Sequence, residues 1–323
     1  MARLVFLGTP VAAVAPLQTL VSAGHEVALV ISRADKRRGR GSDLVPSPVK
    51  AAALELGLPV TDSLDAVAAS GAELGVVVAY GRIIPGRVLE AVPMVNLHFS
   101  LLPRWRGAAP VERAILEGDA ETGVCLMAVE KGLDTGPIYA VGDTSIDETE
   151  TVEELRARLV SIGCRLLIDN LSNGVAGLPV PHEQEGDPSY AEKIRPEELE
   201  LHWERDATHL ARVVRLGRAW TTFRRRRLRV LDAAVEPWAA PGGAVGGTTA
   251  GPAGPAGPAG PAAPAGPAAP EGGSPGALNG EVVTAGEGSH LRLIRVQPEG
   301  KQPMPASDWL RGARPQTSEL LGG

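Results

Sequence analysis

Short apolar runs alternate with segments of helical periodicity along the first half of the chain. Apolar runs bounded by turn residues are typical of strands that are buried on both faces of a sheet. The sequence predicts such strands at residues 4–7, 25–31, 59–61, 75–79 and 94–99. It predicts helices at residues 16–23, 49–56 and 111–117, and a short helix that ends within 88–92. This alternation predicts an α/β domain with a mostly parallel sheet covered on both faces.

The second half of the chain has a different pattern. We predict two further strands at 124–129 and 138–141, a closing amphipathic helix at 152–171, a helix at 207–216, and short alternating segments at 227–233 and 280–296. The alternating segments indicate a small β domain.

A length of 323 residues is typical of about two domains. We expect the first domain at 1–178, a linker rich in proline and charge at 179–206, and a second domain at 207–323. The second domain contains an insert of low complexity at about 239–276, built partly from Gly-Pro-Ala triplets. The run is short and Ala262-Ala263 breaks its period, so we expect a solvated, polyproline-like loop rather than a triple helix.

Composition narrows the class of protein. A hydrophobic content of 44% is ample for folded cores, and the net charge of −6 argues against indiscriminate binding of nucleic acid. Cys125 and Cys164 match no metal spacing, so we expect reduced core thiols and no metal. The first apolar run is too short for a signal peptide and no membrane-spanning run occurs, which makes the cytosol the expected compartment and a membrane partner unexpected.

Two segments of the chain are strongly basic despite the acidic average. The first is a loop that contains Lys36, Arg37, Arg38 and Arg40. The second extends from Arg205 to Arg229 and includes Arg212 and Arg215, which lie near one face of the predicted helix. Each segment is either a solvated surface or a surface that tracks a phosphate backbone. One basic segment in each domain suggests a polyanion that spans both.

Asn96, His98 and Asp134 are the candidates for chemistry. Asn96 and His98 are two residues apart on a predicted strand, so their side chains share one face. Taken singly, the three are more often a strand-end cap, a core histidine and a turn residue. Together, near the ligand-binding end of a parallel sheet, they favour acyl transfer. Asn96 and a protonated His98 supply donors to an oxyanion, and Asp134 accepts a proton from an attacking amine.

Two neighbouring segments offer walls for a ligand. Ser100, Leu101, Leu102 and Pro103 follow the strand of His98 as a rigid segment, and Tyr80-Gly81 allows close backbone approach to a flat heterocycle. The dinucleotide fingerprint G-x-G-x-x-G is absent, which disfavours a nicotinamide enzyme.

These residues together make a sequence that resembles the methionyl-tRNA formyltransferases. The resemblance rests on the motifs Phe6-Leu7-Gly8-Thr9-Pro10, Gly39-Arg40-Gly41, Pro46-Ser47-Pro48-Val49-Lys50, Ala79-Tyr80-Gly81, Asn96-Leu97-His98-Phe99-Ser100-Leu101-Leu102-Pro103, Gly132-Leu133-Asp134-Thr135-Gly136 and Val296-Gln297-Pro298-Glu299-Gly300-Lys301. It covers nearly the whole chain apart from the insert.

The resemblance implies a Rossmann-like formyltransferase domain followed by a small OB-like β-barrel. It implies formyl transfer from 10-formyltetrahydrofolate to the amino group of methionyl initiator tRNA. This reaction needs no metal, and no protein partner is implied. Asn96, His98 and Asp134 are then the catalytic set. Ser100 to Pro103 form the folate-binding segment, and the loop around Arg40 selects the initiator.

The sequence departs from the family pattern in three places. Residues 36–38 carry more positive charge than in many relatives, residues 215–220 lack the usual Asn-Pro-Trp-Pro-like run, and the second domain contains the Gly-Pro-Ala insert. Two alternatives stay open. One is a formyltransferase that acts on a small amine, such as a nucleotide sugar or glycinamide ribonucleotide, which would need neither basic segment. The other is a folate-binding or RNA-binding module without activity, for which the three polar residues have no evident use.

Overall fold

The structure, a computed structural model, describes residues 1–37, 44–237, 273–316 and 319–323. The chain divides into two compact units, Met1–Arg195 and Pro196–Gly323. The division falls within the segment expected to be the linker. Most of the Gly-Pro-Ala insert lies outside the described residues, as do Arg38 and Arg40.

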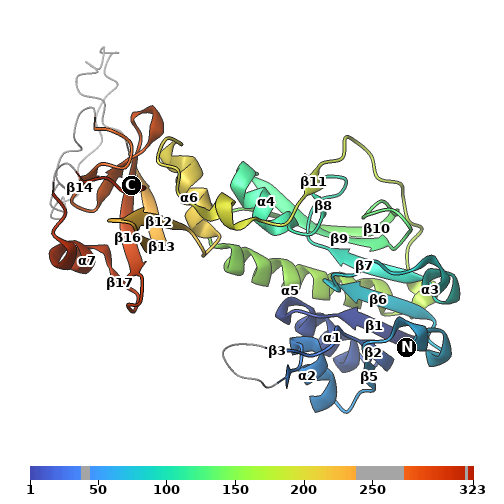
Figure 1. Ribbon diagram of the computed structural model, residues 1–323. Coiled ribbons are helices and arrows are strands. Elements are labelled where there is room, and N and C mark those ends of the chain that lie inside the picture. The colour runs from blue at the N-terminus through green and yellow to red at the C-terminus, as the bar shows by residue number, and fades with distance from the viewer. Residues whose placement is uncertain (38–43, 238–272, 317–318) are drawn as a thin grey trace, which may run out of the picture. The chain divides into compact units, whose positions relative to one another are not determined.

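The first unit is built on a seven-stranded sheet in the order β10-β9-β7-β6-β1-β2-β5 (Figure 1). The strands are β1 (Arg3–Gly8), β2 (Glu26–Ile31), β5 (Val60–Thr61), β6 (Leu74–Val78), β7 (Met94–His98), β9 (Glu121–Ala128) and β10 (Ile138–Ser145). The central strands pair in parallel, whereas β9 is antiparallel to both β7 and β10. The predicted mostly parallel α/β domain is therefore confirmed.

Helices cover this sheet and account for the continuous apolar runs. They are α1 (Val14–Ser22), α2 (Pro48–Glu55), α3 (Gly86–Ala91), α4 (Pro110–Glu117) and α5 (Val152–Leu171). Leu4, Val5, Phe6 and Leu7 are all fully buried, so β1 is covered on both faces. Helix α5 contacts α1, β9 and β10 (Figure 1).

Short elements complete the first unit. Strand β3 (Lys36–Arg37) pairs with β4 (Leu44–Val45) in the basic loop, and β8 (Arg106–Gly107) pairs with β11 (Tyr190–Ala191). Strand β11 lies in the segment expected to be a linker, yet it belongs to the first unit and pairs with a strand of that unit. Single 3₁₀ turns occur at Val11–Ala13, Leu64–Ala66, Ala68–Ser70 and Val175–Gly177.

The second unit is a small β domain, as predicted, and the strands of its sheet pair antiparallel. Its elements are the 3₁₀ turn Pro196–Leu199, α6 (Ala207–Arg215), β12 (Trp220–Phe223), β13 (Arg226–Glu236), β14 (Leu278–Asn279), β15 (Val282–Thr284), the 3₁₀ turn Gly286–Gly288, β16 (His290–Pro298), β17 (Met304–Pro305) and α7 (Ala306–Ala313). The sheet order is β12-β13-β16-β15-β14, and β17 also pairs with β16. Helix α7, which the sequence analysis does not identify, packs Trp309 edge-on against Phe223.

Among the described residues, none of the helices combines the length and the apolar character needed to span a bilayer.

Candidate active site

Strand β7 carries the polar pair that the sequence singles out. His98 ends the strand and is only 5% exposed, while Asn96 is half-buried. The two side chains share a face because strand residues alternate, and Leu97 between them is buried on the other face. The structure therefore keeps the carboxamide and the imidazole on adjacent same-face positions.

Both nitrogens of the His98 ring have a partner. Nε2 lies 2.9 Å from the carbonyl oxygen of Trp105, and Nδ1 lies 3.6 Å from Oδ2 of Asp134. A carbonyl oxygen only accepts, so Nε2 carries a hydrogen and donates it to Trp105. Nδ1 is thus the nitrogen that faces the carboxylate, and when the ring is protonated the two groups form an ion pair.

The Trp105 carbonyl is a partner that the sequence analysis missed. It lies in the loop after β7, where Trp105 has a left-handed φ of 63°. The Ser100 hydroxyl donates to the Arg104 carbonyl at 2.6 Å, and the Trp105 amide donates to the Ser189 hydroxyl at 2.9 Å. These bonds fix the loop that orients the His98 ring.

Asp134 occupies the turn between β9 and β10, as expected, with a φ of 52°. Its side chain is 16% exposed, and Oδ2 accepts a hydrogen bond from the Gly107 amide at 2.8 Å. The carboxylate therefore lies between a backbone N–H and the imidazole, and the structure brings His98 and Asp134 together from distant parts of the sequence.

The predicted folate-binding segment forms the loop beyond His98. Ser100 is fully buried and its hydroxyl is used within the loop, while the Leu102 amide donates to Sγ of Cys125 at 3.4 Å. Burial raises the pKa of the Cys125 thiol to about 11, so this cysteine is an inert core group. The peptide bond from Leu102 to Pro103 is cis.

A cavity of about 340 Å³ borders this loop. It is lined by Leu101, Arg104, Trp105, Asp119, Ala120, Glu121 and Thr122. Arg104 makes a two-point ion pair with Asp119 and lies over the Trp105 ring, 4.5 Å from its centre. Of the predicted folate-binding residues, Leu101 is the one that lines this cavity.

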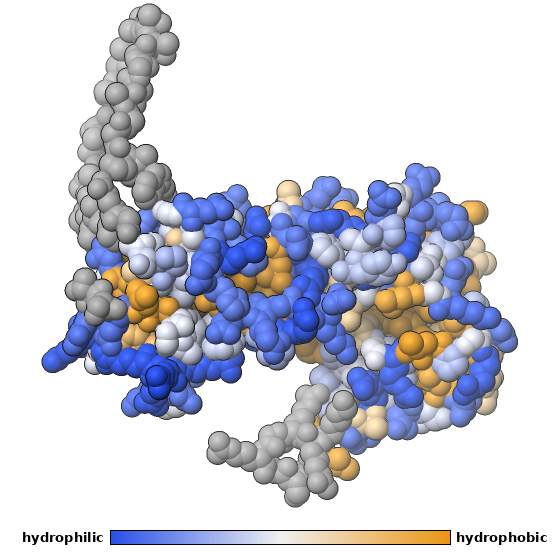
Figure 2. Space-filling view, turned by 45° about the horizontal axis from the view of Figure 1, so that its top comes forward, coloured by the Kyte–Doolittle hydropathy of each residue, from blue (hydrophilic) through white to orange (hydrophobic). Residues whose placement is uncertain are grey.

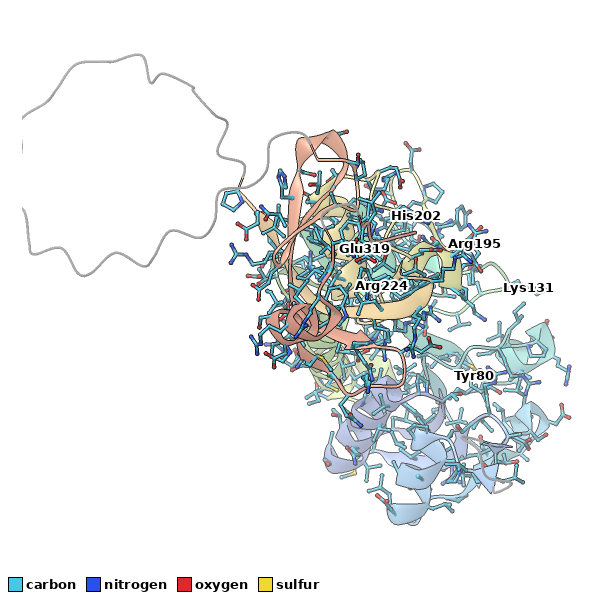
Figure 3. All side chains as sticks on the ribbon, turned by 60° about the vertical axis from the view of Figure 1, so that its left-hand side comes forward. Tyr80, Lys131, Arg195, His202, Arg224 and Glu319 are labelled. Carbon is cyan, nitrogen blue, oxygen red and sulfur yellow. The ribbon has the colours of Figure 1, made fainter. Side chains whose placement is uncertain are left out.

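Tyr80 and Gly81 follow β6 at the same end of the parallel strands. The Tyr80 side chain is only 2% exposed and packs in the core of the first unit, where burial raises its pKa (Figure 3). Gly81 has a φ of 73°, which turns the chain outward, and Ile83 is 89% exposed.

Exposed apolar side chains such as Ile83 and Leu133 contribute hydrophobic surface, and Figure 2 shows hydrophobic patches on this unit.

The first basic segment is held at its base by an ion pair. Lys36 and Arg37 form β3, and just before them Asp35 accepts from Nζ of Lys50 at 2.7 Å. Lys50 is placed by the start of α2, where the Ser47 hydroxyl accepts from its amide. Arg38 and Arg40 belong to the part of the loop that the structure does not describe.

The second basic segment is most exposed in the hairpin that joins β12 and β13. Arg212 and Arg215 on α6 are half-buried, whereas Arg224 to Arg227 are exposed. Arg224 makes a two-point ion pair with Glu319 at 2.6 and 2.7 Å, which lowers the pKa of Glu319 to about 2 (Figure 3). The side chain of Arg227 lies over the Trp220 ring.

Comparison with sequence families gives two matches. Residues 2–171 match the family described as formyl transferase, and residues 193–314 match the formyl transferase C-terminal domain.

Full-length relatives have a more specific name. The chain is 40% identical to a methionyl-tRNA formyltransferase of Clavibacter sepedonicus, over 96% of this chain and 97% of the relative. It is also 40% identical to a methionyl-tRNA formyltransferase of Jannaschia sp. strain CCS1, over 97% of each protein.

Solved structures show the same fold. An N-formyltransferase from Helicobacter canadensis, solved with folinic acid and dTDP-3-aminofucose, aligns with a TM-score of 0.63 at 16% identity, over 92% of this chain and all of the other. A methionyl-tRNA formyltransferase from Clostridium thermocellum aligns with a TM-score of 0.56 at 19% identity, over 73% of this chain and 94% of the other.

Proposed function

This chain belongs to the formyl transferase family, and we propose that it transfers the formyl group of 10-formyltetrahydrofolate to the amino group of methionyl initiator tRNA. The names of the full-length relatives favour charged tRNA over a small amine as acceptor. A folate-binding or RNA-binding module without activity is disfavoured, because simple binding has no evident use for Asn96, His98 and Asp134 together.

One observation carries the chemical part of the proposal. The Asp134 carboxylate lies 3.6 Å from Nδ1 of His98. His98 belongs to strand β7, which also presents Asn96 on the same face. This set provides hydrogen-bond donors for an oxyanion and a carboxylate for a proton within one small region.

The amine attacks the formyl carbon, and negative charge develops on the formyl oxygen. Asn96 and protonated His98 stabilise that oxygen. His98 uses its Nδ1–H, because Nε2–H is donated to Trp105 and the 3.6 Å from Nδ1 to Asp134 is too long for a hydrogen bond that would occupy that proton. Asp134 accepts the proton that the amine loses, directly or through water. The bond from the formyl carbon to N10 of the folate then breaks, N10 takes a proton, and the new amide remains on methionine.

The folate-binding part of the proposal rests on the loop after β7 and the turn after β6. Ser100, Leu101, Leu102 and Pro103 form the binding segment, in which Leu101 contributes its side chain and Ser100 shapes the loop. Tyr80 and Gly81 contribute backbone rather than the tyrosine ring, because that ring is buried.

The tRNA-binding part rests on the two basic segments. Lys36, Arg37, Arg38 and Arg40 approach the phosphates near the acceptor end, and Arg212 and Arg215 belong to the surface that the second unit offers. Phosphate contacts supply most of the salt-dependent affinity in such complexes.

Purified full-length protein with 10-formyltetrahydrofolate and methionyl initiator tRNA tests the proposal. We expect formylmethionine from the initiator and much less from a methionyl elongator tRNA. His98→Ala should abolish the product, and His202→Ala, at an exposed histidine of the second unit, should not. Formylation of a nucleotide-sugar amine without any product on charged tRNA would contradict the proposal.

A further inference from the structure

Residues 182–191 lie across the loops that build the candidate site. The backbone of His182 pairs with Ile138, and the Arg106 amide donates to the Ser189 carbonyl at 2.8 Å. The carbonyl of Ala191 accepts from the amides of the two residues that follow Gly107. This segment, which we call the strap, is thus attached both beside β10 and beside the loop that follows His98.

Gln184 is the strap residue whose side chain reaches the Asp134 turn. Its Nε2 donates to the carbonyls of Asp134 and Gly136, at 2.8 and 2.9 Å, and its Oε1 accepts from Arg106 at 3.1 and 2.6 Å. Carbonyls only accept and a guanidinium only donates, so one orientation of the carboxamide satisfies all four bonds. Few side chains other than glutamine combine two donors and an acceptor at this reach.

These bonds hold Asp134 from two sides. Its carboxylate accepts from the Gly107 amide, while its carbonyl is bound through Gln184 to Arg106, the residue before Gly107. Asp134 also has a left-handed φ of 52°, a conformation that costs energy for a residue other than glycine. External bonds to the turn therefore oppose its relaxation and fix the carboxylate relative to His98.

We propose that Gln184 is a positioning residue for formyl transfer, acting through Asp134. This inference rests on the proposed function. Gln184 sets the separation between the Asp134 carboxylate and the His98 imidazole, and its contacts are with carbonyls and Arg106 rather than with substrate. Its loss should lower the rate of the chemical step and leave substrate binding unchanged, because a displacement of about 1 Å in a catalytic group can cost about 100-fold in rate.

Gln184→Leu removes the N–H donors to the carbonyls of Asp134 and Gly136 with a side chain of similar size. Gln184→Glu replaces these donors with a carboxylate, whose charge repels the two carbonyl oxygens. For both variants of the full-length protein we expect kcat to fall about 10- to 100-fold, with KM for folate and for tRNA within about twofold of the wild type. Glu185→Gln, at an exposed neighbour on the strap, is the matched control and should keep wild-type kcat.

A double-mutant cycle separates positioning from a general structural role. In an Asp134→Asn background, Gln184→Leu should cause little further loss of kcat, since the group that it positions is already altered. The inference would be overturned if Gln184→Leu lowered kcat by the same factor in the Asp134→Asn background as in the wild type. A wild-type kcat in both Gln184→Leu and Gln184→Glu would overturn it as well.

A crystal structure of Gln184→Leu supplies a readout that does not depend on activity. It should show the Asp134 carboxylate displaced from His98, and an unchanged turn would overturn the inference. If the wild type fails to formylate charged tRNA, the proposed function is wrong, and this structure still decides whether Gln184 positions Asp134. If Gln184→Leu does not fold, Gln184→Glu takes its place in both measurements.

Discussion

The Asp134 carboxylate oxygen that lies 3.6 Å from Nδ1 of His98 is the same atom that accepts the Gly107 amide. This one oxygen, in the turn after β9, therefore lies beside both the end of β7 and strand β8. Because the imidazole uses its other nitrogen to donate to Trp105, the ring has a fixed orientation before any substrate binds. Such preorganised groups stabilise developing charge without reorganisation during the reaction.

Asp134→Asn should lower kcat about 100- to 10,000-fold, because it removes the proton acceptor and the charge that faces His98. The shape of the side chain is kept, so the thermal unfolding midpoint should change little. Single-turnover formylation with saturating tRNA measures the chemical step directly. Glu130→Gln removes an exposed carboxylate from the same loop and should have wild-type turnover. If Asp134→Asn and Glu130→Gln lowered kcat equally, the rate would depend on the negative charge of the loop as a whole and not on Asp134.

The elements that the sequence predicts well carry their own local signals. The helix predicted at 152–171 has the same bounds in the structure, where Thr151 and Glu154 form a capping box at its start. The shared face of Asn96 and His98 follows from strand alternation alone. In these cases a periodic pattern or a cap lies within the element itself.

The parts that the sequence does not predict depend on contacts between distant segments. The Trp105 carbonyl and the Gln184 carboxamide act from irregular loops, where no periodicity indicates what a group will contact. The two-residue strands β8 and β11 are too short to leave an alternating pattern. The Tyr80 ring shows a related difficulty, since an aromatic residue after an apolar strand fits a pocket wall and a core position equally well, and the structure buries it.

Gly136→Ala should disrupt the turn that carries Asp134. A Cβ at this position would lie 2.1 Å from the Ala128 carbonyl oxygen, so the backbone must move. We expect a fall in kcat of about 100-fold or more from the displaced carboxylate. Gly312→Ala is the matched control, because a Cβ there meets no atom within 4 Å and the position lies in helix α7. That variant should keep activity and gain about 0.5–1 kcal/mol of stability. Comparable kcat losses in both would contradict the turn's role.

Arg225→Gln should weaken binding of charged tRNA and reduce its salt dependence. Arg225 is exposed in the β12–β13 hairpin, and loss of one phosphate contact lowers the slope of log K against log salt by about 1. Arg165→Gln makes the same change in charge on the exposed face of α5 and should leave the slope unchanged. Binding measured at several salt concentrations distinguishes the two. Equal slopes for Arg225→Gln and the wild type would remove the hairpin from the tRNA-binding surface.

His25 should make the stability of the first unit depend on pH. The side chain is 7% exposed, and its Nδ1 accepts a hydrogen bond from the Ala2 amide at 3.3 Å. Burial first, and then the nearby N-terminal ammonium, lower the pKa of His25 below its ordinary value of 6.5. The unfolded chain therefore binds more protons than the folded chain at pH values between the lowered pKa and 6.5. The stabilisation is complete above about pH 6.5 and is lost as the pH falls through the lowered pKa, with a limiting slope of about 1.4 kcal/mol per pH unit.

His25→Gln removes this titration and keeps a side-chain acceptor, so its unfolding free energy should fall less steeply between pH 7 and 5.5. Amide hydrogen exchange of strands β1 and β2 in the full-length protein reports this free energy for the first unit, which contains both strands. His182→Gln exchanges an exposed histidine of the same unit and should retain the wild-type slope. If wild type and His25→Gln lose stability in parallel as the pH falls, other groups cause the dependence, since a neutral glutamine cannot take up the proton that the unfolded histidine binds.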